Sequence, residues 1–228
     1  AVLGPEAVAI KLNINGAEKT FNIEPGTTLA EVLRVHADLT GTKVVCDRGA
    51  CSACTVWIDN VPTLSCMTLA LDAPDRVSSL ILACTSARMD RDVWNARIVT
   101  VRSHGMAAIV DAVMARFFSE EFRRDHAPQV QTIRDHFLRV NAEGYAGCCA
   151  AIRDMTLLDR VAGIAAPTLI IAGSKDVATP FEGHGSEILK RIPGAQLQMM
   201  PAAHIASVEM PGPFAALVTA FLSGASHA

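Results

Sequence analysis

Four cysteines limit what this chain can fold into more than any other feature of its sequence. Their spacing, C-x4-C-x2-C-x11-C, is typical of the thiolate ligands of a plant-type 2Fe–2S cluster. Because three of them fall within nine residues, the chain must form a loop around the metals. Small residues such as Gly49 and Ser52 let backbone N–H groups approach the sulfurs, which tunes the reduction potential. The four are Cys46, Cys51, Cys54 and Cys66.

A structural zinc site and unligated thiols are the alternatives to a cluster. Four thiolates also suit zinc, but zinc ribbons usually present two C-x2-C pairs and this chain has one. Disulfides fit poorly because the chain has 7 cysteines, an odd number, and Cys148 and Cys149 are adjacent. Nothing at the N-terminus resembles a signal peptide. These features favour a reducing, cytoplasmic setting.

The residues around the cysteines predict a small sheet. Residues 8–14 alternate apolar and polar side chains, Asn15-Gly16 is a strong signal for a two-residue hairpin turn, and residues 19–23 form the returning strand. Apolar residues at helical spacing within 29–33 predict a short helix, and residues 55–59 predict a further strand followed by a turn. Hairpin, helix, metal loop and strand, in this order, predict an α+β domain of the β-grasp type.

Five segments of this N-terminal part carry a family resemblance. They are residues 15–16, 24–29, 39–43, 46–56 and 64–66. With these segments, the part resembles the ferredoxin-like domain in the small iron–sulfur subunit of molybdenum hydroxylases, the group of xanthine dehydrogenase and aerobic carbon monoxide dehydrogenase. The resemblance implies that the four cysteines hold one 2Fe–2S cluster, which exchanges electrons with a partner subunit of the molybdenum or flavin type. Ser52 stands where the family usually has Gly, and no second set of four cysteines follows Cys66.

From about Leu69 the pattern changes to strands that alternate with helices. A short apolar strand ends at Ala83, and a helical stretch follows over residues 92–164, interrupted at Gly144 and Gly147. This alternation predicts right-handed βαβ crossovers and a parallel sheet. The remaining expected elements are a strand at 167–173, a helix at 181–191, a strand at 196–200, a loop at 201–204 and a helix at 213–222.

A second resemblance rests on five segments of this C-terminal part. They are residues 93–98, 105–116, 144–154, 172–180 and 202–204. With them, residues 69–222 resemble the C-terminal part of an α/β-hydrolase, most specifically 3-oxoadipate enol-lactonase. In that family an aspartate after the penultimate strand and a histidine after the last strand complete a Ser…Asp…His triad. By this resemblance Asp176 and His204 occupy those two positions.

The serine of such a triad is missing. It belongs in a G-x-S-x-G turn roughly ten residues before Leu69, one helix length away, and the cysteine-bearing segment stands there instead. No G-x-S-x-G occurs in the chain. Asp176 and His204 are therefore either an incomplete catalytic dyad or a turn aspartate and a loop histidine. Cys84 is a candidate substitute nucleophile, although the end of an apolar strand favours a small buried residue there.

The other polar residues give weaker signals. Arg97, Arg116 and Arg153 could meet an anionic substrate or lie on a solvated surface. The remaining histidines show no spacing typical of metal ligands.

Composition sets the remaining bounds. With 50% hydrophobic and 19% charged residues, the chain is globular, and its length allows two domains, predicted at 1–68 and 69–228. A net charge of −3 without basic runs argues against nucleic-acid binding, and no apolar run has the length of a membrane span.

The two resemblances meet within residues 65–71 without a linker, which predicts a chimera of recombinant, designed or mis-assembled origin. The absence of an initial Met is compatible with a fragment. Because the hydrolase part lacks its first half, its three strands would leave one edge open, and we expect the N-terminal sheet or a second copy in a homo-oligomer to cover it.

Three functions follow from these features. The first is a 2Fe–2S electron-transfer component of an oxidoreductase, which we favour because the ligand set is complete. The alternatives are an enol-lactone or ester hydrolase, and an interaction module built on the helices.

Overall fold

The computed structural model describes residues 7–14, 17–23, 32–37, 55–58, 61–64, 71 and 77–225. Its contacts divide the chain into two compact units, Ala1–Val45 and Cys46–Ala228. The domain limits at 1–68 and 69–228 concern the family of each segment and stay a prediction. The four predicted cluster cysteines lie outside the described residues.

The first unit contains the predicted hairpin. Strands β1 (Val8–Ile14) and β2 (Ala17–Ile23) pair antiparallel, and the last pair is Ile14 with Ala17. Only residues 15 and 16 stand between the two strands in the sequence, which confirms the expected hairpin with a two-residue connection. One helical turn, Val32–His36, contacts β2. Val32 and Leu33 of this turn are buried, as is Phe21 of β2.

The second unit begins, among the described residues, with another antiparallel hairpin. Strand β3 (Thr55–Ile58) was expected, whereas β4 (Val61–Leu64) was not. The sequence pattern does not predict β4, because Pro62 cannot donate a hydrogen bond to a sheet and so argues against a strand. Pro62 nevertheless pairs opposite Trp57, as proline can at the edge of a two-stranded ribbon.

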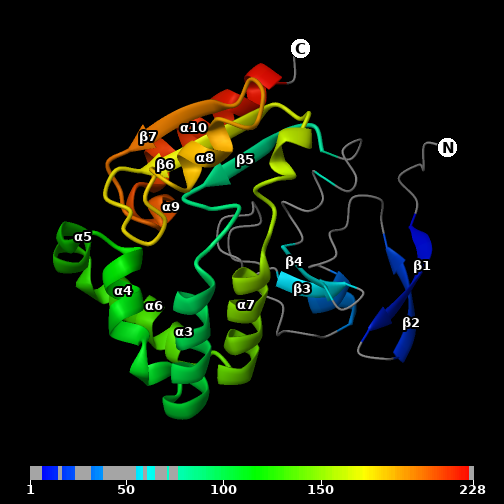
Figure 1. Cartoon of the computed structure of the whole chain (residues 1–228), viewed down its shortest axis with the longest axis horizontal. Helices are drawn as coiled ribbons and strands as arrows, with labels where there is room; N and C mark the ends of the chain where they lie inside the picture. The colour runs from blue at the N-terminus through cyan, green and yellow to red at the C-terminus, as the bar shows by residue number, and fades with distance from the viewer. Residues whose placement is uncertain are drawn as a thin grey trace. The chain divides into compact units, whose positions relative to one another are not determined.

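A three-stranded parallel sheet forms the centre of the second unit (Figure 1). Its strands are β5 (Leu80–Ala83), β6 (Thr168–Gly173) and β7 (Gln196–Met200), in the order β5-β6-β7. All residues of β5 and β6 are buried, which explains why their sequences are continuous apolar runs without alternation. These three strands confirm the predicted parallel sheet.

Helices cover both faces of this sheet. On one face Leu80 and Leu82 pack with Ile188 of α8 (Gly185–Leu189). On the other, Ile81 packs with Phe214 of α10 (Pro211–Ala225). Burying one such side chain contributes about 1.5–3 kcal/mol, so the layers α8, sheet and α10 hold this part of the fold together.

Five helices inserted between β5 and β6 form a cap, which lies below the sheet in Figure 1. Their core contains the fully buried side chains of Val101, Val113 and Phe118. Asp90 begins the first of them, because its side chain accepts the backbone N–H groups of residues 92 and 93. The five are α3 (Arg91–His104), α4 (Val110–Phe117), α5 (Glu120–Asp125), α6 (Ala127–Leu138) and α7 (Ala142–Asp154).

Two sequence expectations about these helices are wrong. Gly144 and Gly147 do not interrupt the stretch, because both lie inside α7, which packs along α3. The Asn141 side chain caps α7 by accepting the Gly144 N–H at 2.9 Å, and packing outweighs a cost of about 0.5–1 kcal/mol per glycine. Helix α8 begins at Gly185, later than the predicted residue 181, because Gly183 has a φ of +82° that no α-helix accommodates.

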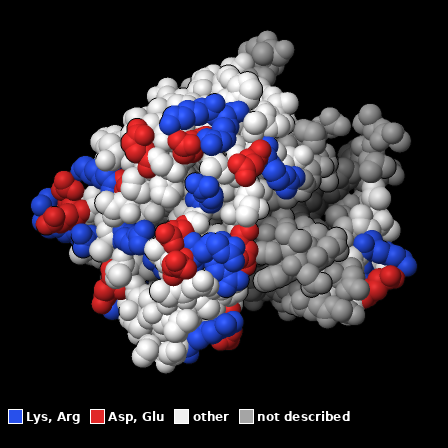
Figure 2. Space-filling view, viewed as in Figure 1, with Lys and Arg blue, Asp and Glu red and all other residues white. Residues whose placement is uncertain are grey.

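Charged side chains form local pairs at the surface. Lys190 and Arg191 both pair with Glu187, at 2.8 and 2.7 Å. On the face shown in Figure 2, basic and acidic side chains are interspersed. Exposed pairs contribute about 0–1 kcal/mol each, so the apolar clusters dominate stability. Among the described residues, no helix is long and apolar enough to span a membrane.

Candidate functional site

The candidate site lies at the carboxyl ends of β6 and β7. Parallel strands end at the same edge of a sheet, so the loops after them are neighbours. Gly173, the last residue of β6, allows the loop after β7 to come close to β6. Any other residue would place a Cβ only 2.4 Å from the Ala202 carbonyl oxygen. The Lys175 N–H also donates to the Ala202 carbonyl at 3.0 Å. The two loops are thereby fixed against each other.

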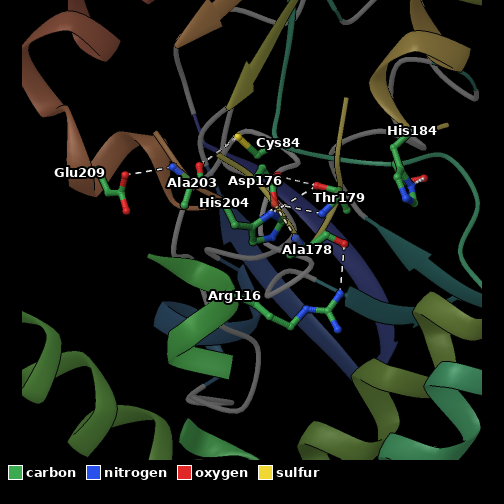
Figure 3. Close-up of polar contacts among 10 residues, drawn as sticks. Cys84, Arg116, Asp176, Ala178, Thr179, His184, Ala203, His204 and Glu209 are labelled. Carbon is green, nitrogen blue, oxygen red and sulfur yellow. Dashed lines mark hydrogen bonds and ion pairs between the residues drawn. The ribbon is translucent and has the colours of Figure 1, made fainter. Parts of the chain in front are cut away.

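These loops bring Asp176 and His204 together (Figure 3). Asp176 Oδ2 lies 3.0 Å from His204 Nδ1, and the Asp176 side chain is only 1% exposed. Its Oδ1 accepts the N–H groups of Ala178 at 2.7 Å and Thr179 at 3.0 Å. The Thr179 hydroxyl donates to Oδ2 at 2.9 Å. Every lone-pair direction of the carboxylate thus faces a donor or the imidazole.

This surrounding keeps Asp176 ionised. Burial alone would raise the pKa of its carboxyl, but the hydrogen bond and charge of His204, with the two groups of Thr179, outweigh burial and lower the pKa below its usual 3.8. A buried carboxylate beside Nδ1 assigns the imidazole proton to that nitrogen. Nε2 is then the nitrogen left to accept a proton.

The cap contributes two residues to the site. The ring of Phe117 stacks on the His204 imidazole, with centroids 5.4 Å apart. Arg116 Nη2 donates to the Ala178 carbonyl at 3.3 Å. Of the three arginines considered from sequence, only Arg116 contacts the Asp176 loop. Arg97 lies over the Trp94 ring, and Arg153 pairs with Asp154.

Cys84 is buried next to the site with a φ of +46°. Burial and the charge of Asp176 raise the pKa of its thiol to about 12. Its Sγ faces the Ala203 carbonyl oxygen at 3.7 Å. A neutral, buried thiol is a poor nucleophile, so the structure favours the interpretation of Cys84 as a small buried residue.

A Ser86–His184 contact was not expected from sequence. Ser86 Oγ lies 2.9 Å from His184 Nδ1 and donates to the Arg88 carbonyl at 2.6 Å. It also accepts the Arg88 N–H at 3.3 Å. These three contacts use the hydroxyl fully, so Ser86 joins two loops rather than acting as a nucleophile. No local signal could reveal a pair 98 residues apart.

No serine hydroxyl contacts His204 in the part of the chain that the structure describes. Within the same residues, no group of three or more His, Cys, Asp and Glu side chains could hold a metal ion. The four predicted cluster ligands are outside them. The described structure therefore contains an Asp–His pair without a nucleophile.

Comparison with known proteins finds two kinds of relatives for the chain. Residues 12–87 match the family model of the 2Fe-2S iron-sulfur cluster binding domain. The nicotine 6-hydroxylase small subunit of Paenarthrobacter nicotinovorans is 38% identical over 71 residues, which are 31% of this chain and 43% of that subunit.

The C-terminal part matches hydrolases. 3-Oxoadipate enol-lactonase 2 of Acinetobacter baylyi is 31% identical over 147 residues, 64% of this chain and 55% of that enzyme. The crystal structure of the enol-lactonase from Burkholderia xenovorans LB400 is similar with a TM-score of 0.67 and 34% identity, over 70% of this chain and 62% of that one. This chain joins a 2Fe-2S domain sequence to part of an α/β-hydrolase.

Both predicted resemblances are thereby confirmed. The 2Fe-2S segment and the hydrolase segment each span about half of the curated relatives, 43% and 55% of their lengths. The predicted hydrolase part, residues 69–228, contains the cap helices, the last strands and the loops of Asp176 and His204. The G-x-S-x-G motif of a hydrolase does not occur in the sequence.

Proposed function

We propose that the chain is a 2Fe–2S electron-transfer protein, a component of an oxidoreductase. The match of residues 12–87 to the cluster-binding domain carries this proposal, because the matched stretch contains Cys46, Cys51, Cys54 and Cys66. Four thiolates are the complete ligand set of one such cluster. When bound, the cluster takes up and releases one electron.

The second hairpin supports a shared site for two of these ligands. Thr55 pairs opposite Leu64, Cys54 directly precedes Thr55, and Cys66 follows Leu64 by two residues. Consecutive Cα atoms are about 3.8 Å apart. The short covalent distance from paired residues of β3 and β4 to Cys54 and Cys66 supports the proposal that these two cysteines share one cluster.

The proposal extends to the fold and partner of the N-terminal segment. The order of the β1–β2 hairpin, the helical turn at Val32–His36 and the β3–β4 hairpin is compatible with a β-grasp domain. The relatives of this segment are named as subunits, for example the aldehyde oxidoreductase iron-sulfur-binding subunit of Escherichia coli. We therefore infer a partner subunit of the molybdenum or flavin type.

The compartment follows from the cysteines. In the described part of the chain, Cys84 and Cys149 are buried thiols that form no disulfide. Buried thiols and a thiolate-bound cluster both suit a reducing compartment, and we infer a cytoplasmic location on this chemistry.

Metal analysis of cysteine variants tests the proposal. Anaerobically purified wild-type protein should contain about two irons and two sulfides per chain. Cys54→Ser should lose most of this iron because it removes one predicted ligand. Cys148→Ser, on helix α7, is the matched control and should keep it. Iron content that is equal in the two variants, or absent from wild type after reconstitution, would refute cluster binding by these cysteines.

A second candidate function is ester or lactone hydrolysis, favoured by the buried 3.0 Å pair of Asp176 and His204. In this arrangement Asp176 holds the imidazole so that Nε2 can accept a proton from a hydroxyl or a water. Without the serine, the pair supplies a general base alone. Hydrolysis of an enol-lactone that drops in His204→Ala and Asp176→Asn would support this function, and equal rates in all three proteins would end it.

A further inference from the structure

Glu209 makes two backbone contacts that link the cap to the loop of His204. It is the last residue of α9 (Ala206–Glu209) and is half-buried. Its Oε2 accepts the Ala203 N–H at 2.9 Å, and its Oε1 accepts the Ser119 N–H. Figure 3 shows the first of these contacts beside the Asp–His pair. One carboxylate therefore joins the residue before His204 to the turn between α4 and α5.

The turn on the cap side contacts His204 directly. Phe117 lies two residues before Ser119, and its ring stacks on the imidazole at 5.4 Å with an interplanar angle of 28°. The Phe117 carbonyl oxygen accepts the Ile205 N–H at 3.0 Å. The backbone is thus held on both sides of His204, at Ala203 by Glu209 and at Ile205 by Phe117.

Loss of the carboxylate would remove one of these two supports. Ala203 is buried, so its N–H would be left without an acceptor, and a buried unpaired donor is unfavourable. The loop would move to satisfy this donor. The same change would free Ser119, and with it the segment that carries Phe117.

We propose that Glu209 is a positioning residue, which holds His204 in hydrogen-bond distance of Asp176 and orders the stacked Phe117. The proposal rests on the second candidate function, because it concerns the Asp–His pair of that site. It requires no catalytic activity to be observed, since the quantity in question is the geometry of the pair.

Two variants separate the contact from its surroundings. Ser119→Pro removes the backbone N–H that donates to Glu209, whereas Ser119→Ala keeps this N–H. Both variants lose the Ser119 hydroxyl that caps α5, so the comparison between them isolates the contact with Glu209. Proline fits this position because Ser119 has a φ of −60° and the preceding Phe118 is extended. Glu209→Ala removes both contacts, and Glu182→Gln, at an exposed glutamate, is the control for the charge.

The test uses nuclear magnetic resonance of histidine-labelled protein to observe the Nδ1–H proton of His204. This proton is assigned as the signal that is present in wild type and absent from His204→Gln. A proton shared with a buried carboxylate resonates far downfield and exchanges slowly. In Glu209→Ala and Ser119→Pro we expect this signal to disappear or its exchange with water to accelerate roughly tenfold or more. Ser119→Ala and Glu182→Gln should match wild type. Amide protection of β6 verifies that each variant is folded.

The outcomes distinguish the two claims. If folded Ser119→Pro and folded Glu209→Ala both retain the signal at the wild-type exchange rate, the positioning role is overturned, even if their melting temperatures fall. Absence of the signal from wild type would overturn it too. A wild-type chain that hydrolyses no lactone, yet whose His204 signal depends on Glu209, would refute the second candidate function and leave the positioning role supported.

Discussion

At the scale of single residues, Asp176 links the folding of the chain to its candidate chemistry. Its carboxylate is buried and accepts hydrogen bonds from two backbone N–H groups and from Thr179. These bonds hold the loop after β6 as well as the imidazole of His204. The carboxylate is therefore expected to stabilise the fold whether or not the site is active.

Asp176→Asn should lower stability at neutral pH by about 1–3 kcal/mol, because the amide is a weaker acceptor and one of its atoms becomes a donor. The folded pKa of Asp176 lies below 3.8. Its ionic contribution is thus present above the unfolded pKa and is lost as the pH falls through the folded value. Urea denaturation at pH 7 and pH 3 should show the gap between variant and wild type narrowing in acid.

Asp159→Asn is the control for this experiment, since Asp159 is exposed. We expect it to change stability by less than about 0.5 kcal/mol at either pH. A gap between Asp176→Asn and wild type that stays constant from pH 7 to pH 3 would contradict the lowered pKa.

At the scale of elements, glycines show where local sequence patterns fail. Gly147 lies within α7 and Gly173 ends β6, but the sequence alone gives both the same turn signal. The surroundings of each glycine in the folded chain show which of the two needs to be a glycine. A Cβ at Gly147 would meet nothing within 4 Å, whereas one at Gly173 would meet two carbonyl oxygens.

Gly147→Ala should therefore stabilise the chain by about 0.5–1 kcal/mol, because alanine loses less backbone entropy in a helix. Thermal unfolding followed by far-ultraviolet circular dichroism would show a higher midpoint for the variant than for wild type. A lower midpoint would mean that α7 is not continuous through this residue.

Gly173→Ala should have the opposite effect. Its Cβ would lie 2.4 and 2.7 Å from the carbonyl oxygens of Ala202 and Ala203, so β6 and the loop before His204 would have to separate. We expect a loss of about 1–3 kcal/mol, as for overpacking in a core. Gly212→Ala, with open space around it, is the control in the same denaturation series, and equal effects of the two changes would contradict the close approach.

At the scale of the whole molecule, sequence patterns located most strands and both family segments. Apolar runs indicated β5, β6 and β7, and alternation with Asn15-Gly16 indicated the first hairpin. Contacts between distant residues were not accessible in this way. Ser86 with His184 joins the loop after β5 to the residue before α8, and Glu209 with Ser119 joins α9 to the cap. No local period in the sequence encodes either contact.

The cysteine motif remains the feature that decides the function, because it is complete while the hydrolase segment lacks its serine. Its four residues lie within the stretch that matches the cluster-binding domain, residues 12–87, whereas Asp176 and His204 lie outside that stretch. We therefore expect mutation of Asp176 or His204 to leave the iron content of the proposed cluster site unchanged.

The most direct test of this account is electron paramagnetic resonance of the anaerobic protein before and after reduction with dithionite. An oxidised 2Fe–2S cluster is silent, and the reduced cluster has one unpaired electron. We predict no signal before reduction and a rhombic signal afterwards, with about one spin per two irons. A protein that binds iron or zinc but gives no signal after reduction would contradict the electron-transfer function.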